Sequence, residues 1–233
     1  MKIAGLQRVS TIDYPGEICC VIFLWGCNFR CGFCYNSSLV IRDQELGISE
    51  EEFFDFLSKR MGKLDAVCIS GGEPLMSLDF GFVRRIKDMG FKVKIDTNGS
   101  FPERLQELVS EGLVDYIAMD VKSCREDYCE VVNVNVDMEK IEESIRIVNE
   151  FENSEFRTTV VPGLHDVGKL VEMGKWMHRV CGGKPKMIFL QGFKRGESMI
   201  DSSFMEKSEV LEGELLRMKM SLDELFEEVG VRV

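Results

Sequence analysis

Three cysteines, Cys27, Cys31 and Cys34, stand close together in the sequence at the spacing C-x3-C-x2-C. They directly follow the apolar run 18–25. That run is too short to cross a bilayer, which takes about 20 apolar residues, and it is typical of a buried strand. Thiolates prefer soft metals such as zinc, copper(I) and the iron of iron–sulfur clusters. The spacing therefore predicts a metal-binding loop at the end of a strand.

The number of thiols separates two kinds of metal site. A structural zinc ion takes four protein ligands, so a zinc site would need a distant fourth ligand such as Cys68 or His165. A [4Fe–4S] cluster held by three thiolates has one iron without a protein ligand, and that iron can bind a small molecule. A cluster that only transfers electrons usually has four cysteines. The cysteines alone leave both interpretations open, and we favour the cluster.

The cysteine motif, with the aromatic Phe33 before its third cysteine, resembles the signature of the radical S-adenosylmethionine (SAM) enzymes. Three more motifs match that family in the same order: Gly71-Gly72-Glu73-Pro74, Asp96-Thr97-Asn98-Gly99 and Asp120-Val121-Lys122. The stretch Ile12-Asp13-Tyr14-Pro15-Gly16 and the pair Tyr35-Asn36 narrow the resemblance to activating proteins of glycyl radical enzymes. It is closest to the activators of anaerobic ribonucleoside-triphosphate reductase and of pyruvate formate-lyase, and it covers about Ile12 to Phe193.

The resemblance implies a role for the residues of the cysteine loop and of the glycine-rich motif. Three thiolates, from Cys27, Cys31 and Cys34, would hold the cluster. Phe33 would lie near the adenine of SAM, and Phe33 and Tyr35 would shield the cluster from water. The edge formed by Gly71, Gly72, Glu73 and Pro74 would hydrogen-bond the amino group of the methionine part of SAM.

The resemblance also implies a role for charged residues at the ends of later strands. Asp96 and Asp120 would lie near the SAM site and could hold a monovalent cation there, with Thr97 beside the first of them. Lys122 would reach the carboxylate or the ribose of SAM. Arg157 would face the mouth of the same site.

Each motif also has a plainer interpretation. The glycine-rich motif is an ordinary strand–helix turn in many proteins, and Asp-Thr-Asn-Gly fits a strand exit followed by a turn. Two features depart from the family pattern: Gln191-Gly192-Phe193 stands where pyruvate formate-lyase activators carry a histidine, and Tyr35 replaces a common histidine. These departures weaken the assignment of the partner enzyme more than they weaken the assignment of the SAM chemistry.

Six cysteines lie outside the motif. Cys124, Cys129 and Cys181 could hold a second cluster or zinc, but no set of four ligands has a spacing like that of the family. We favour plain thiols for Cys124 and Cys129, and we expect Cys19, Cys20 and Cys68, which lie in apolar runs, to be buried and unreactive.

Composition limits the partners. The net charge of −11 argues against a nucleic acid or an anionic membrane as partner, because both need a basic face. Nine cysteines and an N-terminus without a signal-type apolar segment predict a reducing compartment, the cytoplasm. A cluster with an open iron further implies an anaerobic setting.

Six strand–helix repeats are expected along the 233 residues. Strands are predicted over 18–25, 66–70, 92–96, 114–119, 156–161 and 186–190. Helices are predicted from Ser49, near Phe82 and near Pro102, and over 138–152, 167–180 and 205–229. This alternation favours a parallel sheet, and the site motifs follow strand ends, where barrel enzymes place active sites.

We therefore predict an α/β fold, a partial (β/α)6 barrel open on one side, as the resemblance also implies. A doubly wound open sheet is the alternative that the periodicity allows. The radical SAM domain is predicted over 1–204, with a helical tail over 205–233 packed on it.

The predicted function is reductive cleavage of SAM to methionine and a 5′-deoxyadenosyl radical, which then abstracts hydrogen from a glycine of a partner enzyme. The first candidate partner is an anaerobic ribonucleoside-triphosphate reductase, with a ferredoxin or flavodoxin as electron donor. The rivals are a radical SAM enzyme acting on a small molecule and a non-catalytic zinc or iron–sulfur module.

Overall fold

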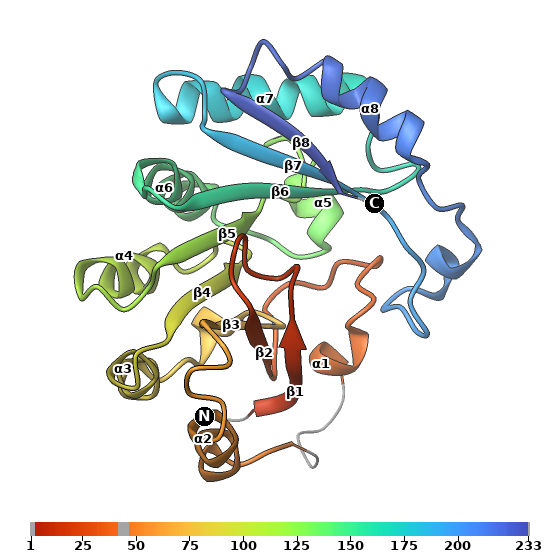
Figure 1. Ribbon diagram of the computed structural model, residues 1–233. Coiled ribbons are helices and arrows are strands. Elements are labelled where there is room, and N and C mark those ends of the chain that lie inside the picture. Colours follow the sequence, from red (N-terminus) through yellow and green to blue (C-terminus); the bar gives the residue numbers. More distant parts are fainter. Residues whose placement is uncertain (1–2, 42–46, 233) are drawn as a thin grey trace. The chain divides into compact units, whose positions relative to one another are not determined.

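The computed structural model describes residues 3–41 and 47–232 (Figure 1). The chain divides into two compact units. The first comprises Met1–Asn28, Ser38–Thr97 and Glu103–Ile117, and the second Phe29–Ser37, Asn98–Pro102 and Ala118–Val233. Met1, Lys2 and Val233, at the ends of the predicted domains, lie outside the described residues, and the predicted boundary after residue 204 stays a prediction.

The first unit is a small β-sheet with helices packed against it. Its elements are β1 (Ile3–Ser10), β2 (Cys19–Leu24), α2 (Glu50–Ser58), β3 (Ala66–Gly71), the 3-10 turn η1 (Pro74–Met76), α3 (Phe80–Asp88) and β4 (Lys92–Thr97). β1 is antiparallel to β2, whereas β2, β3 and β4 are parallel, with Cys19 opposite Ala66 and Ala66 opposite Lys92. Three elements have residues in both units: α1 (Ser37–Ile41), α4 (Pro102–Ser110) and β5 (Tyr116–Asp120).

The second unit repeats the parallel pattern. Its other elements are α5 (Tyr128–Val132), α6 (Met138–Glu150), β6 (Ser154–Val160), α7 (Val167–Cys181), β7 (Met187–Gly192), the 3-10 turn η2 (Ser202–Glu206), α8 (Glu212–Met220) and β8 (Glu228–Arg232). β6, β7 and β8 are parallel neighbours, with Phe156 opposite Ile188 and Ile188 opposite Val229.

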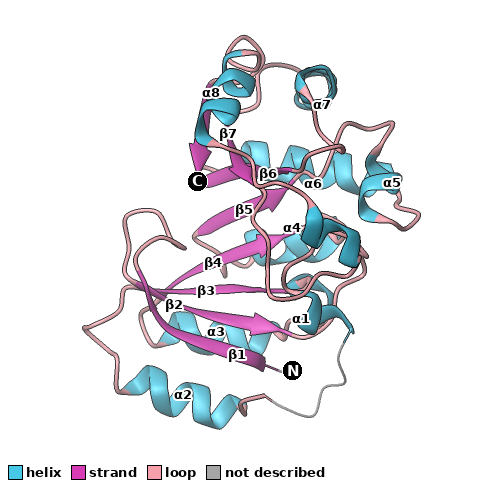
Figure 2. Cartoon of the chain, turned by 90° about the vertical axis from the view of Figure 1, so that its right-hand side faces the viewer, coloured by secondary structure: helices cyan, strands magenta, loops and turns pink. Residues whose placement is uncertain are grey.

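Helices α2 and α3 lie on the same side of the strands of the first unit (Figure 2). The helix predicted from Ser49 is α2, and a capping box starts it: Ser49 and Glu52 exchange backbone and side-chain hydrogen bonds. The rings of Phe53, Phe54 and Phe82 pack with centroids 5.0 to 5.3 Å apart. These buried aromatic rings hold the two helices together on that face of the sheet.

The opposite face of these strands carries a second core. Side chains alternate between the two faces of a strand, so Cys19 and Val21 of β2 and Cys68 of β3 share a face. They pack with Tyr14 and Ala66 in one buried cluster, and Tyr116 packs against it.

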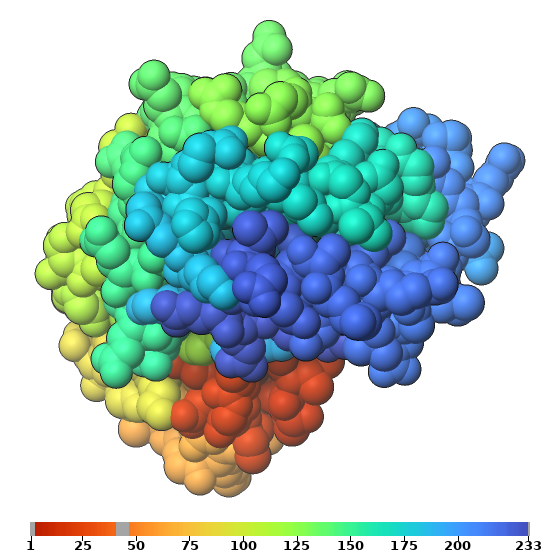
Figure 3. Space-filling view, turned by 90° about the horizontal axis from the view of Figure 1, so that it is seen from above, coloured from red at the N-terminus to blue at the C-terminus, as the bar shows by residue number. Residues whose placement is uncertain are grey.

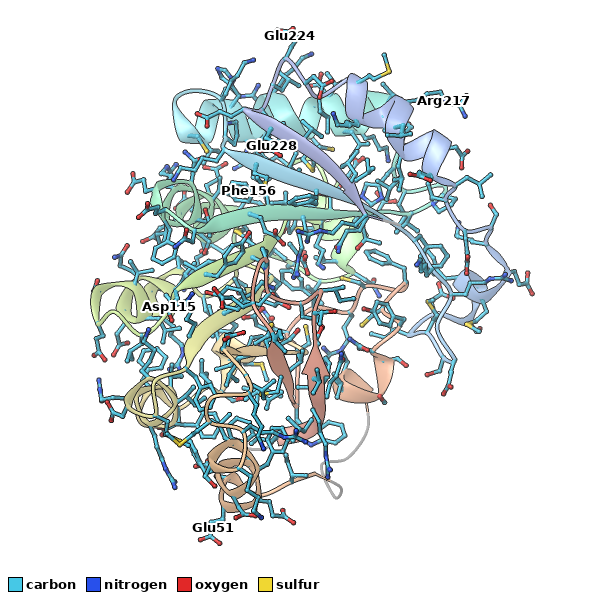
Figure 4. All side chains as sticks on the ribbon, in the orientation of Figure 1. Glu51, Asp115, Phe156, Arg217, Glu224 and Glu228 are labelled. Atoms are coloured by element: carbon cyan, nitrogen blue, oxygen red, sulfur yellow. The ribbon has the colours of Figure 1, made fainter. Side chains whose placement is uncertain are left out.

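The last part of the second unit packs onto α7. A side chain at Gly174 of α7 would lie 2.8 Å from Leu225 and 3.2 Å from Phe226, so the glycine lets these two side chains pack close to the helix. Figure 3 shows the chain from α7 to β8, in cyan to blue, forming a continuous part of the surface. In Figure 4, Phe156 of β6 lies inside the unit, whereas Arg217 and Glu224 project from its edge.

All six predicted strands are present, at slightly different bounds. The helices predicted over 138–152 and 167–180 correspond to α6 and α7. The prediction missed β1, α1, α5 and β8. The helix predicted over 205–229 is wrong outside Glu212–Met220, because Leu222 and Phe226 are buried in turns and the residues after them pair with β7.

None of the described helices combines the length and the apolar character that a membrane span requires.

Candidate cofactor site

The cysteine loop begins where β2 ends. Cys27 belongs to the first unit, and Cys31 and Cys34 belong to the second. The amide of Cys34 donates a hydrogen bond to the carbonyl of Cys31 at 3.0 Å, which makes this end of the loop a tight turn. None of the nine cysteines forms a disulfide, so all three thiols of the motif keep their sulfur atoms for a metal.

Two elements of the second unit hold the loop on either side of Cys31. Before it, the amide of Arg30 donates to the carbonyl of Val132 at the end of α5, at 2.9 Å. After it, the carbonyl of Gly32 accepts from the amide of Asp201, at 3.0 Å, just before η2. These two backbone bonds fix the position of Cys31, which is buried.

The aromatic residues of the loop behave differently from each other. Phe33 is buried, and its ring packs against Phe204 of η2 with centroids 6.0 Å apart. Tyr35 is 65% exposed. Phe33 therefore covers the loop in this structure, whereas most of Tyr35 faces solvent.

The glycine-rich turn of the first unit fits directly against Cys27. A side chain at Gly72 would lie 2.0 Å from the carbonyl oxygen of Gly26 and 3.1 Å from Cβ of Cys27. Gly71 has φ of +131°, a backbone conformation that residues with a side chain rarely adopt. The amide of Glu73 donates to the carbonyl of Gly26 at 2.8 Å. The sequence Gly-Gly is therefore needed for the turn to approach the cysteine loop.

Glu73 holds this turn from inside the protein. Its side chain is fully buried. Its Oε1 accepts a hydrogen bond from the amide of Leu75, at 3.0 Å, and one from the hydroxyl of Thr97 at the end of β4, at 2.8 Å. Pro74 follows as the first residue of η1, where its missing amide hydrogen costs nothing. Both predicted residues, Glu73 and Thr97, thus set the shape of the turn.

Asp96 of β4 is paired with a lysine that the motif analysis did not single out. The ammonium of Lys94 lies 2.5 Å from Oδ1 of Asp96. Only 2% of the Lys94 side chain is exposed. A lysine between Val93 and Ile95 in a buried strand is unusual, and this pattern is the signal in the sequence that could have identified it.

Asp120, Lys122 and Arg157 form one ionic cluster in the second unit. Arg157 Nε lies 2.9 Å from Oδ1 of Asp120, and Lys122 Nζ lies 3.1 Å from Oδ2. Burial alone would raise the pKa of Asp120, but the charges of Arg157 and Lys122 outweigh it and lower that pKa to about 2. Burial opposes the charge of Lys122, but Asp120 raises the pKa of Lys122 above its usual value. Two cations and one carboxylate leave a net positive charge, which suits an anionic group.

His165 fixes the backbone of Lys122. Its Nδ1 accepts a hydrogen bond from the amide of Val161 at 3.0 Å, so the hydrogen is on Nε2, which donates to the carbonyl of Lys122 at 2.9 Å. Burial lowers the pKa of His165 and favours this neutral form. His165 lies in the loop between β6 and α7, and its role in holding Lys122 could not be seen in the sequence.

Tyr128 of α5 was also missed by the sequence analysis. It is completely buried, and its ring packs edge-on against Phe29 and Trp176, with centroids 6.4 and 6.1 Å away.

At the position of the missing family histidine, Phe193 is buried against Phe204.

Among residues 3–41 and 47–232, no three cysteine, histidine, aspartate or glutamate side chains gather as a ready metal-binding group. The indication of a metal centre is the chemistry of the donor set, three thiols in one short loop with no disulfide.

Comparison with known proteins gives three main similarities. The sequence pattern of the radical SAM superfamily matches residues 21–173. A protein of Methanocaldococcus jannaschii, whose name assigns it to the glycyl-radical enzyme activating enzymes, is 36% identical over 208 residues, covering 83% of this chain and 84% of that protein. The pyruvate formate-lyase-activating enzyme of Listeria monocytogenes is 31% identical over 134 residues, covering 52% of this chain and 53% of that enzyme.

The fold is similar to that of SuiB from Streptococcus suis, solved with S-adenosylmethionine. The TM-score is 0.66 at 15% identity, over 91% of this chain and 50% of SuiB. At this identity the similarity concerns the fold alone. It confirms the predicted α/β class with a parallel sheet of the partial-barrel type.

Proposed function

Because the chain belongs to the radical SAM superfamily, we propose that it is an activating enzyme that uses SAM to install a glycyl radical on a partner enzyme. The observation that carries this proposal is the similarity, over most of both chains, to a relative named as an activating enzyme of this kind. The three-thiol loop after β2 supports it, since it supplies the ligands that such an enzyme needs.

The family uses a [4Fe–4S] cluster and SAM. Cys27, Cys31 and Cys34 would hold the cluster, and the three thiols of this loop fit that group. When bound, the cluster supplies the electron that cleaves SAM into methionine and a 5′-deoxyadenosyl radical. The protein supplies the orientation of SAM and the exclusion of water.

In the second unit, Lys122 and Arg157 would attract the carboxylate of SAM, with Asp120 keeping both side chains in place. The bonds that Asp120 accepts from them, at 3.1 and 2.9 Å, fix the two cations before SAM arrives. This arrangement lowers the ordering cost of binding.

In the first unit, the backbone of Gly71 and Gly72 would meet the amino group of SAM. The carboxylate of Glu73 is occupied inside the protein by Leu75 and Thr97. We therefore assign Glu73 to the support of the turn, and direct contact with SAM to the backbone of the turn.

As partner we propose an anaerobic ribonucleoside-triphosphate reductase. The stretch 12–16 and the pair Tyr35-Asn36 support an activator of a glycyl radical enzyme in general, and the lack of a histidine at 191–193 argues against a typical pyruvate formate-lyase activator. A ferredoxin or a flavodoxin is the proposed electron donor.

The test is an anaerobic assay on protein reconstituted with iron and sulfide. We expect a brown protein with about four irons per chain, formation of 5′-deoxyadenosine from SAM under reduction, and a glycyl radical signal by electron paramagnetic resonance when the reductase is added. A colourless protein that holds one zinc ion would refute the proposal. 5′-Deoxyadenosine without a radical on any glycyl radical enzyme would instead indicate a small-molecule substrate.

The ligand role is tested by a pair of cysteine variants. Cys31→Ala should abolish cluster assembly and 5′-deoxyadenosine formation, because the loop then has only two thiols. Cys181→Ala, a half-buried thiol outside the loop, serves as control and should keep both. Turnover retained by Cys31→Ala would show that Cys31 is not a ligand.

A further inference from the structure

The side chain of Lys94 is a buried cation that the SAM chemistry does not use. In the register of the first unit, Lys94 of β4 lies opposite Cys68 of β3. It therefore points to the same face as the buried cluster that contains Tyr14, Cys19 and Cys68. A lysine is rarely buried unless it is paired.

Lys94 is paired with Asp96, one of the two carboxylates at which the sequence resemblance implies a monovalent cation. Its ammonium lies 2.5 Å from Oδ1 of Asp96, 3.9 Å from the sulfur of Cys68 and 5.9 Å from the centre of the Tyr116 ring. The sulfur of Cys68 lies 3.8 Å from the other carboxylate oxygen. The carboxylate thus already has a positive charge against it.

A free alkali cation does not fit these surroundings. Hard cations are held by several oxygen ligands, whereas this carboxylate has the Lys94 ammonium on one oxygen and the Cys68 thiol near the other, with the centre of the Tyr116 ring 5.9 Å from that ammonium. Entry of a cation would also place two positive charges beside one carboxylate in a buried setting, which is unfavourable.

We propose that Lys94 is a tethered cation: its ammonium takes the place at Asp96 that the resemblance gives to a free monovalent ion. The residue after Asp96 is Thr97, whose hydroxyl holds Glu73 and with it the glycine-rich turn. Lys94 is thus a positioning residue. The proposal shares with the proposed function the premise that Asp96 lies at the SAM site.

The consequence is independence from alkali cations. The melting temperature of the wild-type apoprotein should stay the same when potassium, sodium or choline chloride is exchanged at constant ionic strength. After reconstitution, the affinity for SAM should be equal in potassium and choline chloride. Selective stabilisation of the wild-type apoprotein by potassium or sodium would overturn the proposal.

The decisive variant is Lys94→Ala, which removes the ammonium and leaves a space beside Asp96. Its melting temperature should fall by about 10 °C, because a buried carboxylate loses its partner. Methylammonium chloride should restore most of the loss, whereas potassium, a hard cation, and choline, which is too large for the space, should not. Equal effects of all three salts would contradict the proposal.

A matched control is Lys87→Ala, which removes a lysine paired with Asp115 at 2.6 Å in the same unit but with a quarter of its side chain exposed. It should show no selective rescue by methylammonium. If Lys94→Ala does not fold, the double variant Lys94→Met with Asp96→Asn, which removes both charges, should fold and be insensitive to the choice of cation. Failure of the double variant to fold would show that the charges are not what matters.

The melting experiments use apoprotein, so they need neither cluster nor SAM. A wild-type protein that binds no cluster would refute the proposed function but leave the assignment of Lys94 to be decided by the melts. A cluster-bearing protein with cation-selective melting would refute the assignment alone.

Discussion

Replacing Asp120 by asparagine tests the ionic cluster of the second unit most directly. The variant keeps the size of the side chain and removes its charge. Lys122 and Arg157, with 16% and 13% of their side chains exposed, then lose the carboxylate between them. Their mutual repulsion in a poorly solvated place adds to the loss.

The size of the effect follows from the lowered pKa. The pKa of Asp120 is about 2 in the folded protein, against 3.8 for an ordinary aspartate. Each unit of difference corresponds to about 1.4 kcal/mol, so the charged form of Asp120 contributes about 2 kcal/mol to the free energy of unfolding at pH 7. Because the folded pKa is the lower one, this contribution is complete above about pH 4 and disappears as the pH falls towards 2.

The assay is urea unfolding of the apoprotein, with the fluorescence of Trp176 as the reporter of the second unit. The chain has two tryptophans, so the measurements use a Trp25→Phe background. Asp120→Asn should lower the free energy of unfolding by about 2 kcal/mol or more from pH 7 to pH 5, and by less at pH 3. After reconstitution it should also weaken SAM binding while leaving the cluster spectrum unchanged.

Glu172→Gln is the matched control for this experiment. It breaks an ion pair with Lys175 on the surface of α7, where both side chains are about half exposed, and it should change nothing measurable. The reasoning fails if Asp120→Asn unfolds like the wild type, or if its deficit is the same at pH 3 as at pH 7. Unchanged SAM affinity would remove Asp120 from the site.

Two further predictions concern packing. Gly72→Ala places a methyl group 2.0 Å from the carbonyl oxygen of Gly26. It should lower the free energy of unfolding by about 2 kcal/mol and reduce the iron bound on reconstitution. The control Gly183→Ala, with open space around it, should change neither. Arg232→Ala removes the two 2.7 Å hydrogen bonds that the guanidinium donates to the buried carboxylate of Glu155. It should lower the free energy of unfolding by about 3 kcal/mol and speed amide hydrogen exchange in β8. Wild-type iron content in Gly72→Ala, or unchanged exchange in Arg232→Ala, would count against these contacts.

Local patterns in the sequence predicted much of the fold. The apolar runs 18–25, 66–70 and 114–119 coincide with strands or parts of strands, and the capping box at Ser49 starts a helix. These features depend on neighbours within a few residues, which a sequence displays directly.

The missed elements depend on distant partners. β1 and β8 have weak patterns of their own and are strands because β2 and β7 offer free edges to pair with. In the tail, the spacing of Leu222, Leu225 and Phe226 favours a helix, but turns bury two of the three just as well. Contacts with distant segments thus override the local preference for a helix or a loop.

The same distinction applies to the candidate site. The motifs named the thiols, the glycine-rich turn and the charges at strand ends. They could not show that Glu73 turns inward to Thr97, or that Asp96 already has Lys94 as a partner. Both facts depend on which side chains meet across neighbouring strands, and a linear pattern does not contain that information.

The ring of His165 offers a way to watch Lys122 without touching it. One ring nitrogen binds the amide of Val161 and the other binds the carbonyl of Lys122, so any shift of that backbone alters the imidazole. The chain has only two histidines. Nitrogen-15 labelling of histidine therefore yields a magnetic resonance spectrum in which only one other residue, His178, contributes signals, and SAM docking can be followed as a displacement of the His165 resonances.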